Sequence, residues 1–138
     1  MKLAVVLCTI MLWSLTASAA SDPGAETDAE SAARAWLALV DAGKYADSWS
    51  SAAAAFRQKL TAAQWQAAAS AARAPLGALK SRTLRSATHT GTLPGAPDGD
   101  YVVLQFNSSF EHKESAVETV TPMKDADGQW HVSGYYIS

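Results

Sequence analysis

Two glutamates beside a polar bend are the residues with the clearest capacity for acid–base chemistry. Glu111 and Glu118 flank residues 112–115, and a hairpin there would bring the two carboxylates toward each other. Such a pair can raise the pKa of one member until it abstracts a proton near neutral pH. Charged side chains at a turn are more often solvated, and Lys113 lies close by. We therefore favour solvated glutamates, with the catalytic pair as the alternative.

A histidine and a tyrosine near the C-terminus form a second candidate. In a strand, alternation places His131 and Tyr135 on one face. The apolar residues Trp130, Val132 and Tyr136 then share the other face. If the Trp130 face packs on the helices, His131 and Tyr135 point either into a concave pocket or into solvent, and solvent is the favoured outcome.

The basic residues are scattered along the chain and form one cluster, at Lys80, Arg82 and Arg85. In a strand, Lys80 and Arg82 share a face and could contact an anion. The alternative, which we favour, is that they protect an exposed sheet edge from pairing with other chains.

Metal and cofactor chemistry finds little support. His89, His112 and His131 fall in three different segments without paired-histidine or cysteine spacing, and Cys8 is the single cysteine. We predict no metal site and no cofactor.

The elements that must position these residues begin with three helices. Apolar side chains recur at helical spacing, and Thr27 with Glu30 and Thr61 with Gln64 form capping boxes. We expect helices over residues 27–42, about 45–56 and about 61–74.

The second half of the chain changes to a period of two, which is typical of strands. Turn residues at 93–99 and 125–128 separate the segments, and Pro122 marks an edge or a bulge. We expect strands over residues 79–90, 101–110, 116–123 and 129–137. Helices followed by strands predict an α+β fold, with three helices packed against a four-stranded antiparallel meander.

The first residues have the character of an export signal. Lys2 precedes an apolar run over residues 3–15, and small residues follow at 17–19. The run of 13 residues falls short of the roughly 20 that span a bilayer. We expect a signal peptide at 1–19, a disordered leader at 20–26 and a single domain at 27–138. The protein would be exported, periplasmic or secreted, without stable membrane insertion.

The charge balance argues against one class of partner. The chain has 11 basic and 13 acidic residues and a net charge of −2. A nucleic-acid-binding protein normally carries a clustered positive excess. We predict no nucleic-acid partner.

Four sequence blocks together resemble the DUF4019 family, an uncharacterised family of exported bacterial proteins. They lie at 74–77 (APLG), 93–103 (LPGAPDGDYVV), 118–123 (ETVTPM) and 127–136 (DGQWHVSGYY), and the resemblance extends from about residue 32 to 137. The family implies no activity, substrate or catalytic residue, and it suggests a Gram-negative periplasm. The element order also resembles the nuclear-transport-factor-2-like and cystatin-like folds, in which a curved sheet and helices form a cone around a pocket.

Our leading hypothesis is an exported, non-catalytic module that binds a small ligand or a protein partner. Its candidate surface combines residues of three strands: Val103, Gln105, Asn107, Glu118, His131 and Tyr135. A homodimer could use the same surface.

The alternative is a cofactor-free proton-transfer enzyme, similar to an isomerase or a hydrolase, with a pocket beneath the sheet. Glu118 or His131 would act as base and Tyr135 as hydrogen-bond donor. This alternative requires the side chains to converge within about 8 Å.

Overall fold

The computed structural model describes residues 22–138, in which helices precede strands. The helical part consists of α1 (Pro23–Asp41), α2 (Tyr45–Ser51), α3 (Ala54–Lys59), α4 (Ala62–Arg73) and the short 3₁₀ helix η1 (Ala74–Leu76). The strands are β1 (Leu79–Thr90), β2 (Tyr101–Phe110), β3 (Lys113–Lys124) and β4 (Trp130–Ile137).

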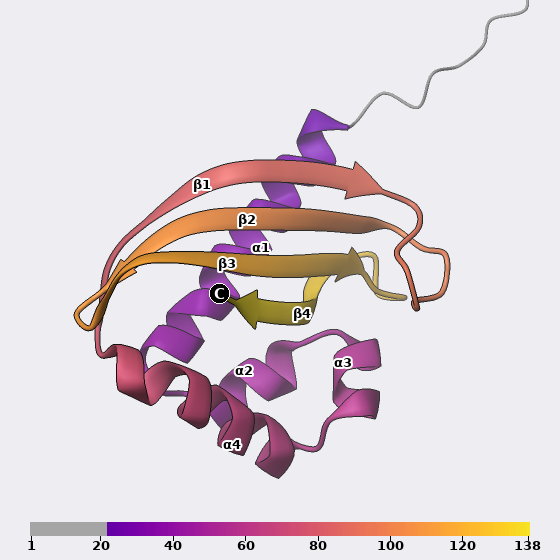
Figure 1. The fold of residues 1–138 in the computed structure, drawn as a ribbon. Coiled ribbons are helices and arrows are strands. Elements are labelled where there is room, and N and C mark those ends of the chain that lie inside the picture. The colour runs from indigo at the N-terminus through magenta and orange to yellow at the C-terminus, as the bar shows by residue number, and fades with distance from the viewer. Residues whose placement is uncertain (1–21) are drawn as a thin grey trace, which may run out of the picture.

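The architecture is α+β, as the element order predicted. The strands pair antiparallel in the order β1-β2-β3-β4, which is a meander. Helix α1 runs behind the strands, and α2 and α4 lie below them (Figure 1). We call the sheet face that packs on the helices the core face, and the opposite one the outer face.

The first helix begins earlier than its sequence pattern predicted. Helix α1 starts at Pro23, and the Asp22 side chain accepts a hydrogen bond from the Gly24 amide at 2.9 Å. Thr27, the predicted cap, instead donates its hydroxyl to the Pro23 carbonyl at 2.9 Å. Residues 23–26 therefore form the first turn of the helix and not part of a disordered leader. The rest of the predicted leader and the signal peptide lie outside the described residues.

The predicted second helix is two helices. Ala52 and Ala53 adopt extended backbone angles between α2 and α3. The Ala53 amide donates to the Val132 carbonyl of β4 at 2.8 Å, and the Ala54 amide donates to Asp125 Oδ2 at 3.0 Å. Contacts with the sheet thus supply hydrogen bonds at the break, and the described residues contain four α-helices where three were predicted.

The third predicted helix is confirmed as α4. Thr61 and Gln64 form the expected capping box, with both reciprocal hydrogen bonds present. The chain leaves η1 at Gly77, whose φ of 71° favours a residue without a Cβ.

The strands match their predictions closely, with bulges that the pattern did not locate. The register shifts between Leu79 and Ser81 and again between Leu84 and Ser86. Another shift lies between Ser108 and Phe110 of β2, and the one between Thr121 and Pro122 confirms the irregularity expected at Pro122. Strand β3 also begins three residues earlier than predicted.

Aromatic side chains fill the space between the helices and the core face. Trp36 of α1 lies 5.5 Å from the ring of Trp65 of α4 and 5.5 Å from Tyr135 of β4. Both indoles donate to one buried serine: Trp36 Nε1 to the Ser48 carbonyl and Trp65 Nε1 to the Ser48 hydroxyl, each at 2.8 Å. These bonds fix α1 and α4 against α2, and the resulting core positions the sheet.

Candidate functional site

Glu118 lies at the centre of the largest polar cluster of the core. It follows Ala116 and precedes Val120 on the core face of β3, and its side chain has no exposed surface. It pairs with Phe106 across the sheet, well away from the bend near Glu111. The predicted approach of Glu111 and Glu118 is therefore absent, because the register carries Glu118 into the middle of the sheet.

Four hydrogen bonds engage both oxygens of the Glu118 carboxylate. Arg82 Nε donates to Oε1 at 2.8 Å, and Arg82 Nη2 donates to Oε2 at 3.1 Å. The Ser108 hydroxyl donates to Oε1 and the Tyr135 hydroxyl to Oε2, each at 2.5 Å. This set occupies the hydrogen-bonding capacity of an ionised carboxylate.

Arg82 extends the cluster to the ends of two helices. Its Nη1 donates to Asp41 Oδ2 at 2.8 Å, and its Nη2 donates to Asp41 Oδ1 at 3.0 Å. Arg73, in the last turn of α4, donates from Nη2 to Asp41 Oδ1 at 2.8 Å. Two arginines and two carboxylates thus join β1, β3, α1 and α4 with balanced formal charge.

Arg73 has a second kind of neighbour. Its guanidinium lies over the ring of Phe110, 4.7 Å from the centroid, where the ring face attracts a cation. Its Nε and Nη1 atoms are buried without a hydrogen-bond acceptor among the described residues. The aromatic face accounts for the orientation of this side chain.

The cluster shifts the pKa of three of its members. Burial raises the pKa of Tyr135 above its ordinary value, and the Glu118 charge adds to the effect. For Asp41, burial raises the pKa, but hydrogen bonds from Arg82 and Arg73 outweigh burial and lower it. Burial lowers the pKa of Arg82, but bonds to Asp41 and Glu118 outweigh burial and raise it. These directions favour a charged Asp41 and a charged Arg82 beside a neutral Tyr135 phenol.

His131 does not join this cluster. Its Nδ1 lies 3.1 Å from the Ser51 carbonyl oxygen and its Nε2 lies 2.8 Å from Asp127 Oδ2. Glu118 pairs with Ile137, six residues along β4, which separates the two positions by about 20 Å. Of the three residues that the enzyme hypothesis required to converge, only Glu118 and Tyr135 do so.

The predicted faces of β4 are wrong beyond its midpoint. The register advances from Thr121 to Pro122 on β3 while β4 passes from Gly134 to Val132, which leaves Ser133 as the extra residue of a bulge. Val132 is buried and Tyr135 packs against the same core, whereas Tyr136 is 66% exposed. His131 and Tyr135 therefore lie on different faces, because the bulge shifts the alternation by one residue.

The two candidate anion-binding residues are separated in the same way. The shift between Leu79 and Ser81 places Lys80 at a bulge, and its side chain is exposed. Arg82 points to the core face, with only 8% of its side chain accessible. The anions that Arg82 contacts are the carboxylates of Glu118 and Asp41.

Val103, Gln105 and Asn107 lie together on the outer face of β2. The register places Gln105 between Ser86 of β1 and Thr119 of β3, and Thr119 in turn pairs with Tyr136 of β4. The next row joins Thr83, Asn107 and Val117 across the same strands. Hydroxyl and amide side chains thus predominate in these two rows, and Val117 is their one aliphatic residue.

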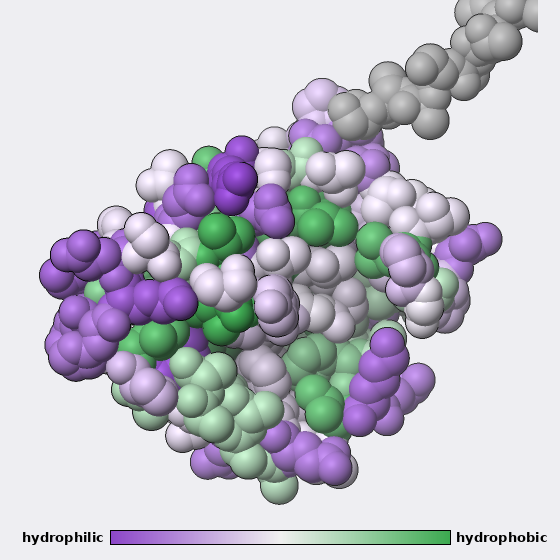
Figure 2. Space-filling view, viewed as in Figure 1, coloured by the Kyte–Doolittle hydropathy of each residue, from purple (hydrophilic) through white to green (hydrophobic). Residues whose placement is uncertain are grey.

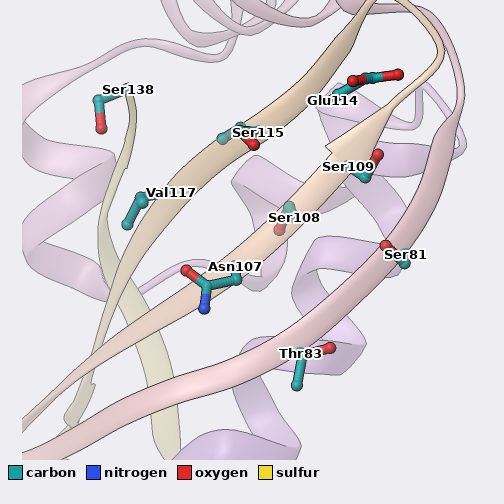
Figure 3. Close-up of a pocket in the computed structure, with 10 residues that line it drawn as sticks. Ser81, Thr83, Asn107, Ser108, Ser109, Glu114, Ser115, Val117 and Ser138 are labelled. Atoms are coloured by element: carbon teal, nitrogen blue, oxygen red, sulfur yellow. The ribbon is translucent and has the colours of Figure 1, made fainter.

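A shallow hollow of about 340 Å³ lies at one end of the outer face. Its lining comes from β1, β2, β3 and the chain end, as Figure 3 shows. Hydroxyls and an amide predominate, with one ionisable residue, Glu114. In the space-filling view, pale and green side chains occupy much of the strand region, and purple ones gather toward the periphery (Figure 2).

The described residues were also compared with what a metal site and a membrane-spanning helix require. Among residues 22–138, no three histidine, cysteine, aspartate or glutamate side chains gather to hold a metal ion. No helix in the same range has the length and apolar character needed to cross a membrane.

Sequence reasoning missed three members of the cluster: Asp41, Arg73 and Ser108. Ser108 could have been identified from the sequence, because this serine interrupts the inward-facing series Leu104, Phe106 and Phe110. Asp41 and Arg73 carry no comparable signal, since only the packing of the helix ends brings them to Arg82.

Comparison with known proteins gives one match. No curated protein and no solved structure matches the chain. The family model described as a protein of unknown function (DUF4019) matches residues 32–135, which include β1, β2 and β3 and most of β4. The chain therefore belongs to the DUF4019 family.

Proposed function

We propose that the protein is a non-catalytic binding module that receives a small ligand or a protein partner on the outer face of its sheet. The observation that carries the proposal is the contrast between the two faces. The ionisable groups of the core face are paired with one another, whereas the outer face presents solvent-exposed hydroxyl and amide groups, those of Thr83, Asn107 and Ser115 among them, around a hollow.

The same contrast argues against the proton-transfer enzyme. Glu118 is fully buried and accepts four hydrogen bonds, so a substrate could reach it only if the core opened. Tyr135 is held protonated by its raised pKa and by its bond to Glu118. A general base must lie within hydrogen-bond reach of its substrate, and this carboxylate has no free direction of approach.

Export is the second part of the proposal. Its support is the basic residue, the apolar run and the small residues of the first 19 positions. Intact mass of the protein recovered from the periplasm or the medium tests it, with an N-terminus at Ala20 as the expected result. Recovery of an unprocessed chain in the cytoplasm would contradict it.

The binding face can be tested by one substitution at its centre. Asn107→Arg places a large charge on the exposed outer face of β2. A library of neutral polar metabolites is added to the protein, and ¹⁵N-resolved NMR measures the resulting changes in amide chemical shift. We expect Asn107→Arg to abolish the changes that the unaltered protein shows. It should also dissociate any homodimer seen by sedimentation equilibrium.

Two matched variants make this test decisive. Ala38→Arg adds the same charge to the exposed surface of α1, and Tyr135→Phe removes the phenol of the core cluster. Both should bind as the unaltered protein does. Binding that survives in Asn107→Arg but is lost in Tyr135→Phe would overturn the proposal in favour of a site in the core.

A further inference from the structure

A second hollow, of about 360 Å³, lies at the other end of the outer face, and we call it the groove. It lies between α3 and the loop that joins β1 to β2. Its walls are mainly apolar, with Leu93, Pro94, Pro97, Tyr101 and Met123 among the lining residues. Sites for small molecules start at about this volume and are lined mostly by apolar groups with a few polar ones.

The loop wall of this groove is held in place by hydrogen bonds. The Tyr101 hydroxyl donates to the Pro97 carbonyl at 2.7 Å, and the Ala96 amide donates to the Leu93 carbonyl at 3.2 Å. The Gly99 amide closes the base of the loop on the Gly91 carbonyl at 3.0 Å. The wall is therefore formed before any ligand arrives, which reduces the entropy cost of binding.

A glycine helps to keep the groove open. Gly134 of β4 lines it, and a Cβ built there would meet only the Thr121 Cβ, at 3.9 Å. That separation is ordinary van der Waals contact, so a small side chain fits without displacing its neighbours. A larger one would project into the groove.

The groove has one charged lining residue, Lys59, at the end of α3. Lys59 is exposed and forms no ion pair with any residue in the range 22–138. Gln58 lies beside it and adds an amide. The groove thus combines apolar walls with a single cation at its rim.

We propose that this groove binds a small amphiphilic anion, with an unbranched aliphatic tail against the apolar walls and a carboxylate beside Lys59. Charge complementarity selects the anionic headgroup, and the volume limits the ligand to a short or medium chain. The inference rests on the proposed function, because the groove forms one end of the same outer face.

Octanoate is the probe that tests the proposal, with ¹⁵N-resolved NMR of the protein expressed from its full coding sequence. We expect amide shift changes at residues 93–97, Met123 and Gly134 that saturate with concentration. Octan-1-ol should bind more weakly and octylammonium more weakly still. Shortening the tail to hexanoate should weaken binding on the order of tenfold, because two methylenes lose apolar contact. Acetate should cause no saturable change.

Two substitutions separate the tail site from the charge. Gly134→Val should remove binding of octanoate and of octan-1-ol, since it fills the groove. Lys59→Gln should weaken octanoate by about two- to fivefold and leave octan-1-ol unchanged, as expected for one exposed charge. Ser86→Val, outside the groove on β1, and Lys44→Gln, at the start of α2, are the matched controls and should bind normally.

The outcomes distinguish this inference from the function on which it rests. Amide shift changes that octanoate causes only in the groove support both the groove proposal and the proposed binding function of the outer face. Metabolite shifts in the hollow around Asn107, with no saturable octanoate response at Gly134, would overturn the groove while the binding face stands. Equal binding of octanoate and octylammonium would overturn the anion preference. Shifts centred on Glu118 and Tyr135 would overturn both proposals.

Discussion

Replacing Glu118 by glutamine removes the charge at the centre of the core cluster with little change in shape. Removing one partner of a buried ion pair typically costs about 3–5 kcal/mol, because the remaining charge stays buried. Here Asp41 still holds Arg82 through bonds of 2.8 and 3.0 Å. We therefore expect Glu118→Gln to lower the free energy of unfolding by about 3 kcal/mol, the lower end of that range.

Urea unfolding followed by tryptophan fluorescence and circular dichroism measures this loss. At an m-value of about 2 kcal/mol/M, the midpoint should fall by about 1.5 M. Glu114→Gln is the matched control, because Glu114 lies exposed at the start of the same strand. It should change stability by no more than about 0.5 kcal/mol.

A double variant checks that the cost comes from the pair. Glu118→Gln with Arg82→Met removes both members, so it should be less destabilised than the sum of the single variants by at least about 1 kcal/mol. A loss below about 1 kcal/mol for Glu118→Gln alone, or strict additivity in the cycle, would refute the assignment of Glu118 as a buried, charge-paired group.

Three further predictions use other parts of the fold. Ser48→Ala leaves the Trp65 indole N–H without its buried acceptor, so the free energy of unfolding should fall by about 1–3 kcal/mol in urea titrations; an unchanged midpoint would contradict the role of the Ser48 hydroxyl. Gly77→Ala forces a side chain into a backbone with φ of 71° and ψ of −159°, 3.0 Å from Glu111 Cβ and His112 Cδ2, and a loss of about 1–3 kcal/mol in thermal unfolding is expected; equal melting temperatures would contradict the need for glycine at this turn. The pKa of His131 is raised above 6.5, first by its hydrogen bond with Asp127, so its stabilising contribution is present below that ordinary value and is lost as the pH rises through the folded-state pKa. The stability gap between the protein and its His131→Asn variant should therefore shrink between pH 5.5 and 8.5, and a gap that widens would reverse the assignment.

Hydrophobic periodicity predicted most of the architecture. The α4 capping box, the stop at Gly77 and the strand that begins at Tyr101 are all local features, and each is confirmed. The split between α2 and α3 was not predictable in this way. It coincides with the bond from the Ala53 amide to Val132, a residue 79 positions later, and no local pattern records such a partner.

The candidate site was predicted only in part. Alternation along β2 correctly grouped Val103, Gln105 and Asn107 on one face. Alternation along β4 failed for Tyr135, because the bulge at Ser133 shifts the period. Applied to β3, the same argument would have placed Glu118 inward between Ala116 and Val120, but its charge favoured a solvated turn.

The sequence by itself determined the α+β class, the order of its elements and the family to which the chain belongs. These follow from local spacing, capping residues and turn chemistry, which act over a few positions. Only the tertiary structure decided which charges are buried. Asp41, Arg73, Arg82 and Glu118 come from four different elements, and packing brings an arginine to each carboxylate, to Glu118 inside the core and to Asp41 at its solvent-exposed rim. The same packing leaves the outer face of the sheet uncovered, where the binding proposals can be tested.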